Sequence, residues 1–149
     1  MAGRFGASTT IGRPIDDVFA FLADGENDKR FSKRIVEIKQ TTPGAPGVGT
    51  VYASTAKDGG MTAKHEFELT EFQPPSKIRW TERSRTTPVS VPEGGYDLER
   101  DGEGTRLTFF NILEGRGLLG KILEPVALRS ARKQADEFVA SIKRVIEAG

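Results

Sequence analysis

The sequence predicts an α+β domain in which two short helices and a curved antiparallel sheet precede one long C-terminal helix. Ala63, His65, Phe67 and Leu69 alternate with polar residues, a pattern typical of a strand with one buried face. Apolar residues recur at helical spacing from residue 128 to residue 145. No connection between the expected strands from residue 35 to residue 113 has a helical pattern, so we expect these strands to be antiparallel. The 149 residues suit a single domain that spans 1–149.

Two breaker signals define the N-terminal elements. Residues 3–11 are expected to form a strand that ends at the Gly12-Arg13-Pro14 breaker. Pro14 stands at a helix start, where its missing N–H costs nothing, and apolar residues recur at helical spacing from Ile15 to Leu22. This helix is expected to end near Asp24-Gly25, and a second short helix to cover about 26–31.

The β region follows from alternation and turn signals. We expect strands at about 35–42, 50–57, 63–70, 77–81, 95–100 and 105–113. Asp58-Gly59-Gly60 is a hairpin signal, and Pro74-Pro75 turns the chain. The loop from Arg85 to Gly94 and the flexible stretch Gly115-Arg116-Gly117 are the two segments expected to border a cavity mouth.

The C-terminal pattern predicts a helix from about Leu118 to Ala148. A helix of about 30 residues is about 45 Å long, enough to run the length of the sheet. Pro125 lies inside this span, so we expect a kink there or a shorter helix ahead of it.

Composition excludes several kinds of site. The 22 basic and 21 acidic residues nearly balance, so nothing favours nucleic acid as a partner. The chain has no cysteine and one histidine, which excludes disulfides and thiolate sites and leaves no expected metal or other cofactor. No apolar stretch approaches the ~20 residues that span a bilayer, and no export signal is recognisable, so we expect a cytoplasmic protein.

Several segments, in order along the chain, carry a resemblance to a known family. They are Arg13-Pro14-Ile15-Asp16-Asp17-Val18-Phe19, Gly47-Val48-Gly49-Thr50, Glu71-Phe72-Gln73-Pro74-Pro75 leading into Ile78-Arg79-Trp80, and Gly102-Glu103-Gly104-Thr105-Arg106-Leu107. Together they resemble the START-like superfamily and, within it, the polyketide cyclase/dehydrase (SRPBCC) family. Phe31 departs from the family pattern, which often has Trp there.

The resemblance implies the helix-grip fold, a seven-stranded antiparallel sheet wrapped around the C-terminal helix with a cavity between them. It also implies a small hydrophobic ligand such as a lipid or polyketide, bound or transformed in that cavity. Stable membrane insertion is not expected, and the protein is expected to be a monomer or a homodimer.

The expected cavity lining combines apolar residues with a few polar ones. The apolar candidates are Val36, Ile38, Phe67, Ile78, Trp80, Leu98, Phe109, Leu118 and Ile122, and the alternative for each is plain core packing. The polar candidates are His65, Glu82, Ser84, Tyr96 and Asn111, because inward-facing polar groups need partners.

His65, Glu82 and Tyr96 are the candidates for acid–base catalysis. His65 is alternatively a structural histidine, and Glu82 alternatively pairs with an arginine or reaches solvent. The sequence does not show whether His65 and Glu82 face each other. Two functions therefore stay open: a module that binds its ligand unchanged, and a cyclase or dehydratase that moves protons on it.

Overall fold

The computed structural model describes residues 3–58, 60–84 and 86–149, and it confirms the α+β class and the expected order of elements. The strands are β1 (Gly3–Ile11), β2 (Ile35–Gln40), β3 (Val51–Asp58), β4 (Met61–Gln73), β5 (Lys77–Ser84), β6 (Val89–Asp101) and β7 (Gly104–Gly115). The helices are α1 (Ile15–Ala23), the 3-10 turn η1 (Gly25–Asn27), α2 (Asp28–Phe31) and α3 (Gly117–Ala148).

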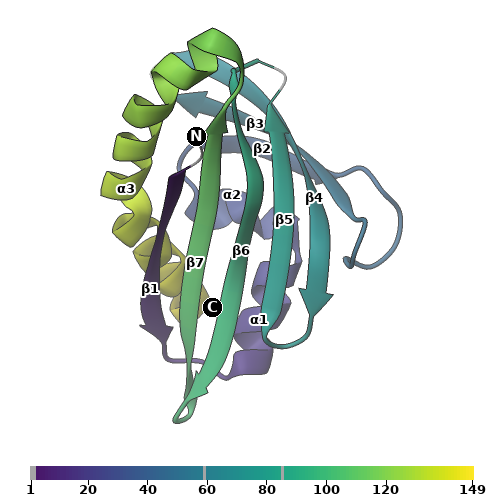
Figure 1. Ribbon diagram of the computed structural model, residues 1–149. Coiled ribbons are helices and arrows are strands. Elements are labelled where there is room, and N and C mark those ends of the chain that lie inside the picture. Colours follow the sequence, from purple (N-terminus) through teal and green to yellow (C-terminus); the bar gives the residue numbers. More distant parts are fainter. Residues whose placement is uncertain (1–2, 59, 85) are drawn as a thin grey trace.

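The seven strands form one antiparallel sheet in the order β1-β7-β6-β5-β4-β3-β2. Consecutive strands from β2 to β7 are neighbours, and β1 pairs with β7 to complete the sheet. Figure 1 shows the sheet curving around α1, α2 and α3, which all lie on one side of it. This is the helix-grip arrangement.

The core lies between this concave face and the helices. α1 buries Ile15, Val18, Phe19 and Leu22, and the C-terminal half of α3 buries Ala135, Val139, Ile142 and Ile146. Burial of each large aliphatic side chain contributes about 1.5–3 kcal/mol relative to exposure. The core therefore anchors both ends of the chain to the sheet.

Strand β6 begins earlier than expected. The segment 89–94, expected to be part of a loop, belongs to the strand, although it contains Pro92. The pairing of β6 shifts register between Ser90 and Glu93, so Pro92 lies in a bulge where its missing N–H removes no ladder hydrogen bond. Residues 89–94 of the expected cavity mouth are therefore strand, and Arg85, where that loop was expected to begin, lies outside the described residues.

The segment leading into α3 is held in place. The backbone N–H of Arg116 donates to Pro88 O at 2.7 Å, and its guanidinium donates to Ser84 O at 3.0 Å. Gly117 takes a positive φ of 67°, which glycine adopts without strain. α3 is then one helix through Pro125, so no shorter helix precedes that residue.

A bulge in β2 reverses the predicted direction of one side chain. The register between β2 and β3 shifts between Ile35 and Glu37. Because each single-residue shift reverses the facing of side chains, Ile35 points inward and Val36 points to solvent. Val36 is therefore not part of the cavity.

Candidate functional site

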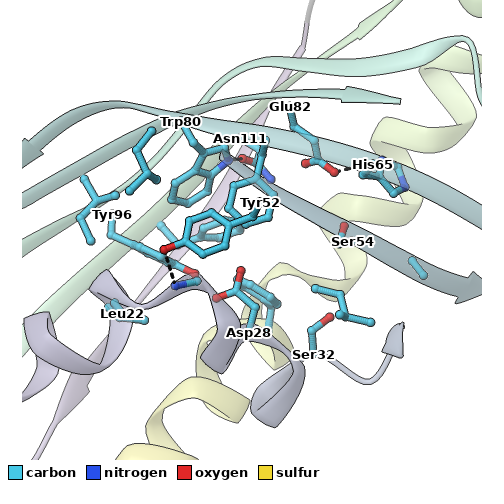
Figure 2. A pocket seen from close by; sticks show the side chains of 18 of the residues that line it. Leu22, Asp28, Ser32, Tyr52, Ser54, His65, Trp80, Glu82, Tyr96 and Asn111 are labelled. Carbon is cyan, nitrogen blue, oxygen red and sulfur yellow. Dashed lines mark hydrogen bonds and ion pairs between the residues drawn. The ribbon is translucent and has the colours of Figure 1, made fainter. Parts of the chain in front are cut away.

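A cavity of about 220 Å³ lies between α2 and the concave face of the sheet. Its apolar wall is formed by Leu22, Ala23, Gly25, Ile35, Ala56, Phe67, Leu69, Ile78, Trp80, Phe109 and Phe138. Its polar wall is formed by Asp28, Ser32, Arg34, Tyr52, Ser54, His65, Glu82, Tyr96 and Asn111. Figure 2 shows the polar side chains reaching the same space from the strands and from α2.

Aromatic rings from five strands and from α3 contribute to the cavity lining. Tyr52 and Phe67 stack with 4.9 Å between ring centroids, as expected of directly opposite residues on β3 and β4. Trp80 packs edge-on against Tyr96 at 4.9 Å, and Phe109 contacts Phe138 at 4.6 Å. These contacts fix the rings in place, so the cavity has a rigid aromatic lining.

His65 and Glu82 face each other. His65 Nδ1 lies 3.1 Å from Glu82 Oε1, and both side chains are mostly buried (Figure 2). They come from adjacent strands in diagonal positions, because Glu82 stands opposite Phe67 and His65 opposite Ser84. A carboxylate only accepts hydrogen bonds, so a neutral imidazole in this contact would carry its proton on Nδ1 and present Nε2 as an acceptor.

Trp80 and Asn111 are joined across an intervening strand. Trp80 Nε1 donates to Asn111 Oδ1 at 3.2 Å, from β5 to β7. Gly94 of β6 pairs with both residues, and a Cβ atom there would overlap both side chains. Glycine at this position therefore permits the hydrogen bond that closes the cavity wall.

Among the described residues, two titratable groups of the wall lack a hydrogen-bond or ion-pair partner. Within the described residues, neither the Asp28 carboxyl nor the Tyr96 hydroxyl makes a hydrogen bond or an ion pair. Burial raises the pKa of the Asp28 carboxyl well above its ordinary value, and the negative charges of Glu82 and Asp24 raise it further. Burial likewise raises the pKa of Tyr96. Both groups are therefore suited to donate a hydrogen bond to an oxygen atom.

Tyr52 differs from Tyr96, although both line the cavity. Its hydroxyl accepts the backbone N–H of Gly25 at 3.1 Å, which ties β3 to η1. Burial raises the pKa of this phenol, and the hydrogen bond from Gly25 partly opposes that shift. The Tyr52 hydroxyl thus has a structural partner, whereas the Tyr96 hydroxyl does not.

The structure places eight of the predicted lining residues at the cavity: His65, Phe67, Ile78, Trp80, Glu82, Tyr96, Phe109 and Asn111. Ile38 and Leu98 are buried in the core instead. The hydroxyl of Ser84 accepts the N–H groups of Thr86 and Thr87, so it stabilises the turn after β5 and does not line the cavity.

Leu118 and Ile122 lie outside the cavity and are largely exposed. Ile122 is about 200° around the helix from the fully buried Ile142, so the two cannot share one face. Phe138 is the α3 residue that reaches the cavity wall.

Several lining residues were not predicted. Tyr52, Ser54 and Ala56 share one face of β3, and their period-two spacing was the signal available in the sequence. Asp28 belongs to a four-residue helix, which is too short for any periodicity to reveal which way its side chain points.

A second hollow of about 250 Å³ adjoins the first. The two share Ser32, Arg34, Phe109, Asn111 and Phe138 as lining residues, and Phe138 is the α3 residue among them. The far wall of the second hollow includes Phe5 of β1 and Ala135 of α3.

The described residues contain no group of three His, Asp or Glu side chains arranged to hold a metal ion. Among the helices of the described chain, none has the length and apolar character required to cross a bilayer.

Comparison with known proteins gives one family and several similar structures. The family model described as "Polyketide cyclase / dehydrase and lipid transport" matches residues 2–147. The comparison with curated protein sequences found no significant match.

The similar structures share the fold at low sequence identity. The protein TTHA0849 from Thermus thermophilus superposes with a TM-score of 0.78 at 18% identity, over 98% of both chains. The Zhui aromatase/cyclase from Streptomyces sp. R1128 gives 0.75 at 14%, over 99% of this chain and 93% of that one. Major latex-like protein 151 from Panax ginseng gives 0.70 at 17%, over 99% and 96%.

Proposed function

Because the chain belongs to the polyketide cyclase/dehydrase and lipid transport family, we propose that it binds a compact hydrophobic ligand carrying an oxygen-containing group. The observation that carries this proposal is the cavity of about 220 Å³, in which aromatic and aliphatic side chains surround two titratable groups that have no partner among the described residues. An apolar pocket with a few convergent polar groups is the usual form of a small-molecule site.

Asp28 and Tyr96 are the proposed anchors of the ligand. Figure 2 shows the Asp28 carboxyl rising from α2 into the cavity, on the side of the lining where Tyr96 lies. The Asp28 and Tyr96 oxygens open onto the cavity, where a ligand oxygen that accepts from them gains hydrogen bonds in largely apolar surroundings. The site is thus expected to discriminate against ligands that lack such an oxygen.

The test compares 2-naphthol with naphthalene, which differ only in one hydroxyl group. Trp80 is the single tryptophan of the chain and lines the cavity, so its fluorescence reports binding. We expect 2-naphthol to bind about tenfold more tightly than naphthalene, the effect of one hydrogen bond of about 1.4 kcal/mol.

The chain offers a matched pair of variants, because its two tyrosines both line the cavity. Tyr96→Phe should remove most of the preference for 2-naphthol and leave naphthalene binding unchanged. Tyr52→Phe, whose hydroxyl is already bonded to Gly25, should keep the preference. If neither probe changes the Trp80 emission and native mass spectrometry retains no species from a lipid extract, the binding proposal fails.

The contact between His65 and Glu82 favours a second candidate function, acid–base catalysis of the cyclase or dehydratase type. Glu82 orients the imidazole through Nδ1, and Nε2 is then available to accept a proton from a ligand carbon next to a carbonyl. A proton abstracted there leaves an enolate oxygen, which donors such as Asp28 and Tyr96 are suited to stabilise.

Deuterium exchange at the α-carbon of 2-tetralone, followed by NMR, tests this candidate without knowledge of the natural substrate. An enzyme of this type should accelerate the exchange, and His65→Ala should slow it by about 100-fold or more, the usual contribution of a general base. Glu82→Gln should have a smaller effect because it keeps a group near Nδ1. Exchange at the same rate in all three proteins would rule out His65 as the base.

A further inference from the structure

The first turns of α3 expose an apolar surface. Its residues are Leu118, Leu119, Ile122, Leu123 and Val126, which are between 39% and 81% exposed. We call this set the α3 apolar face. Figure 1 shows this part of α3 at the outer edge of the molecule, beyond the sheet.

The α3 apolar face has no role in the cavity or in the core. None of its five residues lines either hollow described above. The opposite side of the same turns does pack: Gly120 is buried, and the Glu124 carboxylate accepts the Gly115 N–H at 2.8 Å. Single exposed apolar residues are ordinary, but a contiguous group of this kind marks an interaction surface.

Basic residues predominate in the segment that carries this face. Residues 116–133 contain five basic residues and one acidic residue, although the whole chain is nearly balanced. Lys121, Arg129 and Lys133 are exposed and form no hydrogen bond or ion pair with any described residue. The acidic residue, Glu124, is engaged with Gly115. Within residues 116–133 the charge without a partner among the described residues is therefore positive.

We propose that the α3 apolar face docks on an anionic lipid surface. Its side chains enter the boundary between headgroups and acyl chains, and Lys121, Arg129 and Lys133 contact the headgroup phosphates. The helix then lies along the membrane and does not span it. A second copy of the chain fits this face less well, because a two-fold contact would bring like charges together.

Vesicle co-sedimentation tests the proposal. The intact protein is mixed with phosphatidylcholine vesicles, either pure or containing about a third phosphatidylserine, whose negative surface attracts Lys and Arg. We expect binding to the mixed vesicles that weakens with added salt, and much weaker binding to pure phosphatidylcholine.

Two sets of variants separate the apolar and the charged contributions. Leu118→Asp with Ile122→Asp should lower vesicle affinity at least about tenfold, because two apolar side chains no longer enter the lipid. Val48→Asp is the matched control, since Val48 is 70% exposed but lies in the loop between β2 and β3. Lys121→Gln with Arg129→Gln and Lys133→Gln should lower affinity for the mixed vesicles by about fivefold for each charge removed.

The possible results are distinguishable from one another and from failure of the ligand proposal. Equal affinity of the Leu118/Ile122 variant and the wild type would overturn membrane docking, as would absence of wild-type binding. A wild-type dimer that this variant dissociates, without vesicle binding, would assign the face to self-association and overturn the proposal. Binding of 2-naphthol, which depends on the cavity, should be unchanged in every variant.

Discussion

Asp28 is an ionisable residue whose side chain lies in a largely apolar cavity. Its carboxyl lines an aromatic cavity without a protein donor among the described residues, and burial raises its pKa well above the ordinary value. A raised pKa in the folded state means that the folded protein holds this proton more tightly than the unfolded chain. The wild type therefore loses stability as the pH rises from the ordinary Asp pKa of about 3.9 through the folded-state value.

Asp28→Asn should consequently be more stable than the wild type near neutral pH, by about 1 kcal/mol, the usual scale of a single substitution. The gain should shrink toward about pH 4, where the wild-type carboxyl is largely protonated in the folded protein and partly protonated in the unfolded chain. Urea unfolding at both pH values measures this difference. Asp136→Asn, at an exposed position of α3, is the control and should show no such pH dependence. A gain that is equal at both pH values would contradict the assigned cause.

Among the secondary-structure elements, the packing of β5, β6 and β7 depends on Gly94. It lies on β6 between Trp80 of β5 and Asn111 of β7, where a Cβ atom would overlap both. Gly94→Ala should therefore destabilise the protein by about 1–3 kcal/mol, the cost of overpacking a rigid site.

The same substitution should shift the emission of Trp80, because the hydrogen bond to Asn111 is disturbed. Gly47→Ala is the matched control, since no atom lies within 4 Å of the added Cβ and φ is not positive there. Urea unfolding and the fluorescence spectrum give both readouts. An unchanged emission spectrum in Gly94→Ala would show that the wall tolerates a side chain at this position.

The elements themselves were predictable from the sequence because turns and alternation are local. The breaker at 12–14 and the alternation at 63–70 are confirmed in β1, α1 and β4. The bulges at Val36 and Pro92 were not predictable, because the register of a neighbouring strand produces them. The first bulge turns Val36 toward solvent, and the second allows β6 to include Pro92.

The positions of the polar side chains in the cavity were harder to predict than the strands and helices that form it. Alternation on β4 and β5 indicated that His65 and Glu82 face inward, but their 3.1 Å contact depends on the stagger between the two strands. Asp28 depends on how α2 docks against the sheet, which no local pattern records. The outward position of Leu118 and Ile122 depends on where the buried stripe of α3 begins.

The size of the cavity is a property of the whole molecule, because α1, α2, α3 and the sheet all contribute side chains to its wall. At about 220 Å³ the cavity is smaller than the roughly 300–1,000 Å³ typical of ligand pockets. The second hollow lies directly beyond Phe138, and together the two fall within that range. Of the five residues in the shared wall, Phe138 is the one from α3, and we expect its ring to limit ligand size.

Phe138→Ala should therefore convert the protein from a binder of two-ring ligands to one that accepts four rings. We expect the variant to bind oestradiol at least about tenfold more tightly than the wild type, since new apolar surface becomes available to the larger ligand. The substitution should also cost about 3 kcal/mol of stability, the low end for Phe→Ala because Phe138 is only partly buried. Phe72→Ala is the control, because Phe72 packs against Phe19 outside both hollows. It should lose stability without gaining oestradiol, and a gain in both variants would show that loosening of the core, not removal of a partition, admits the larger ligand.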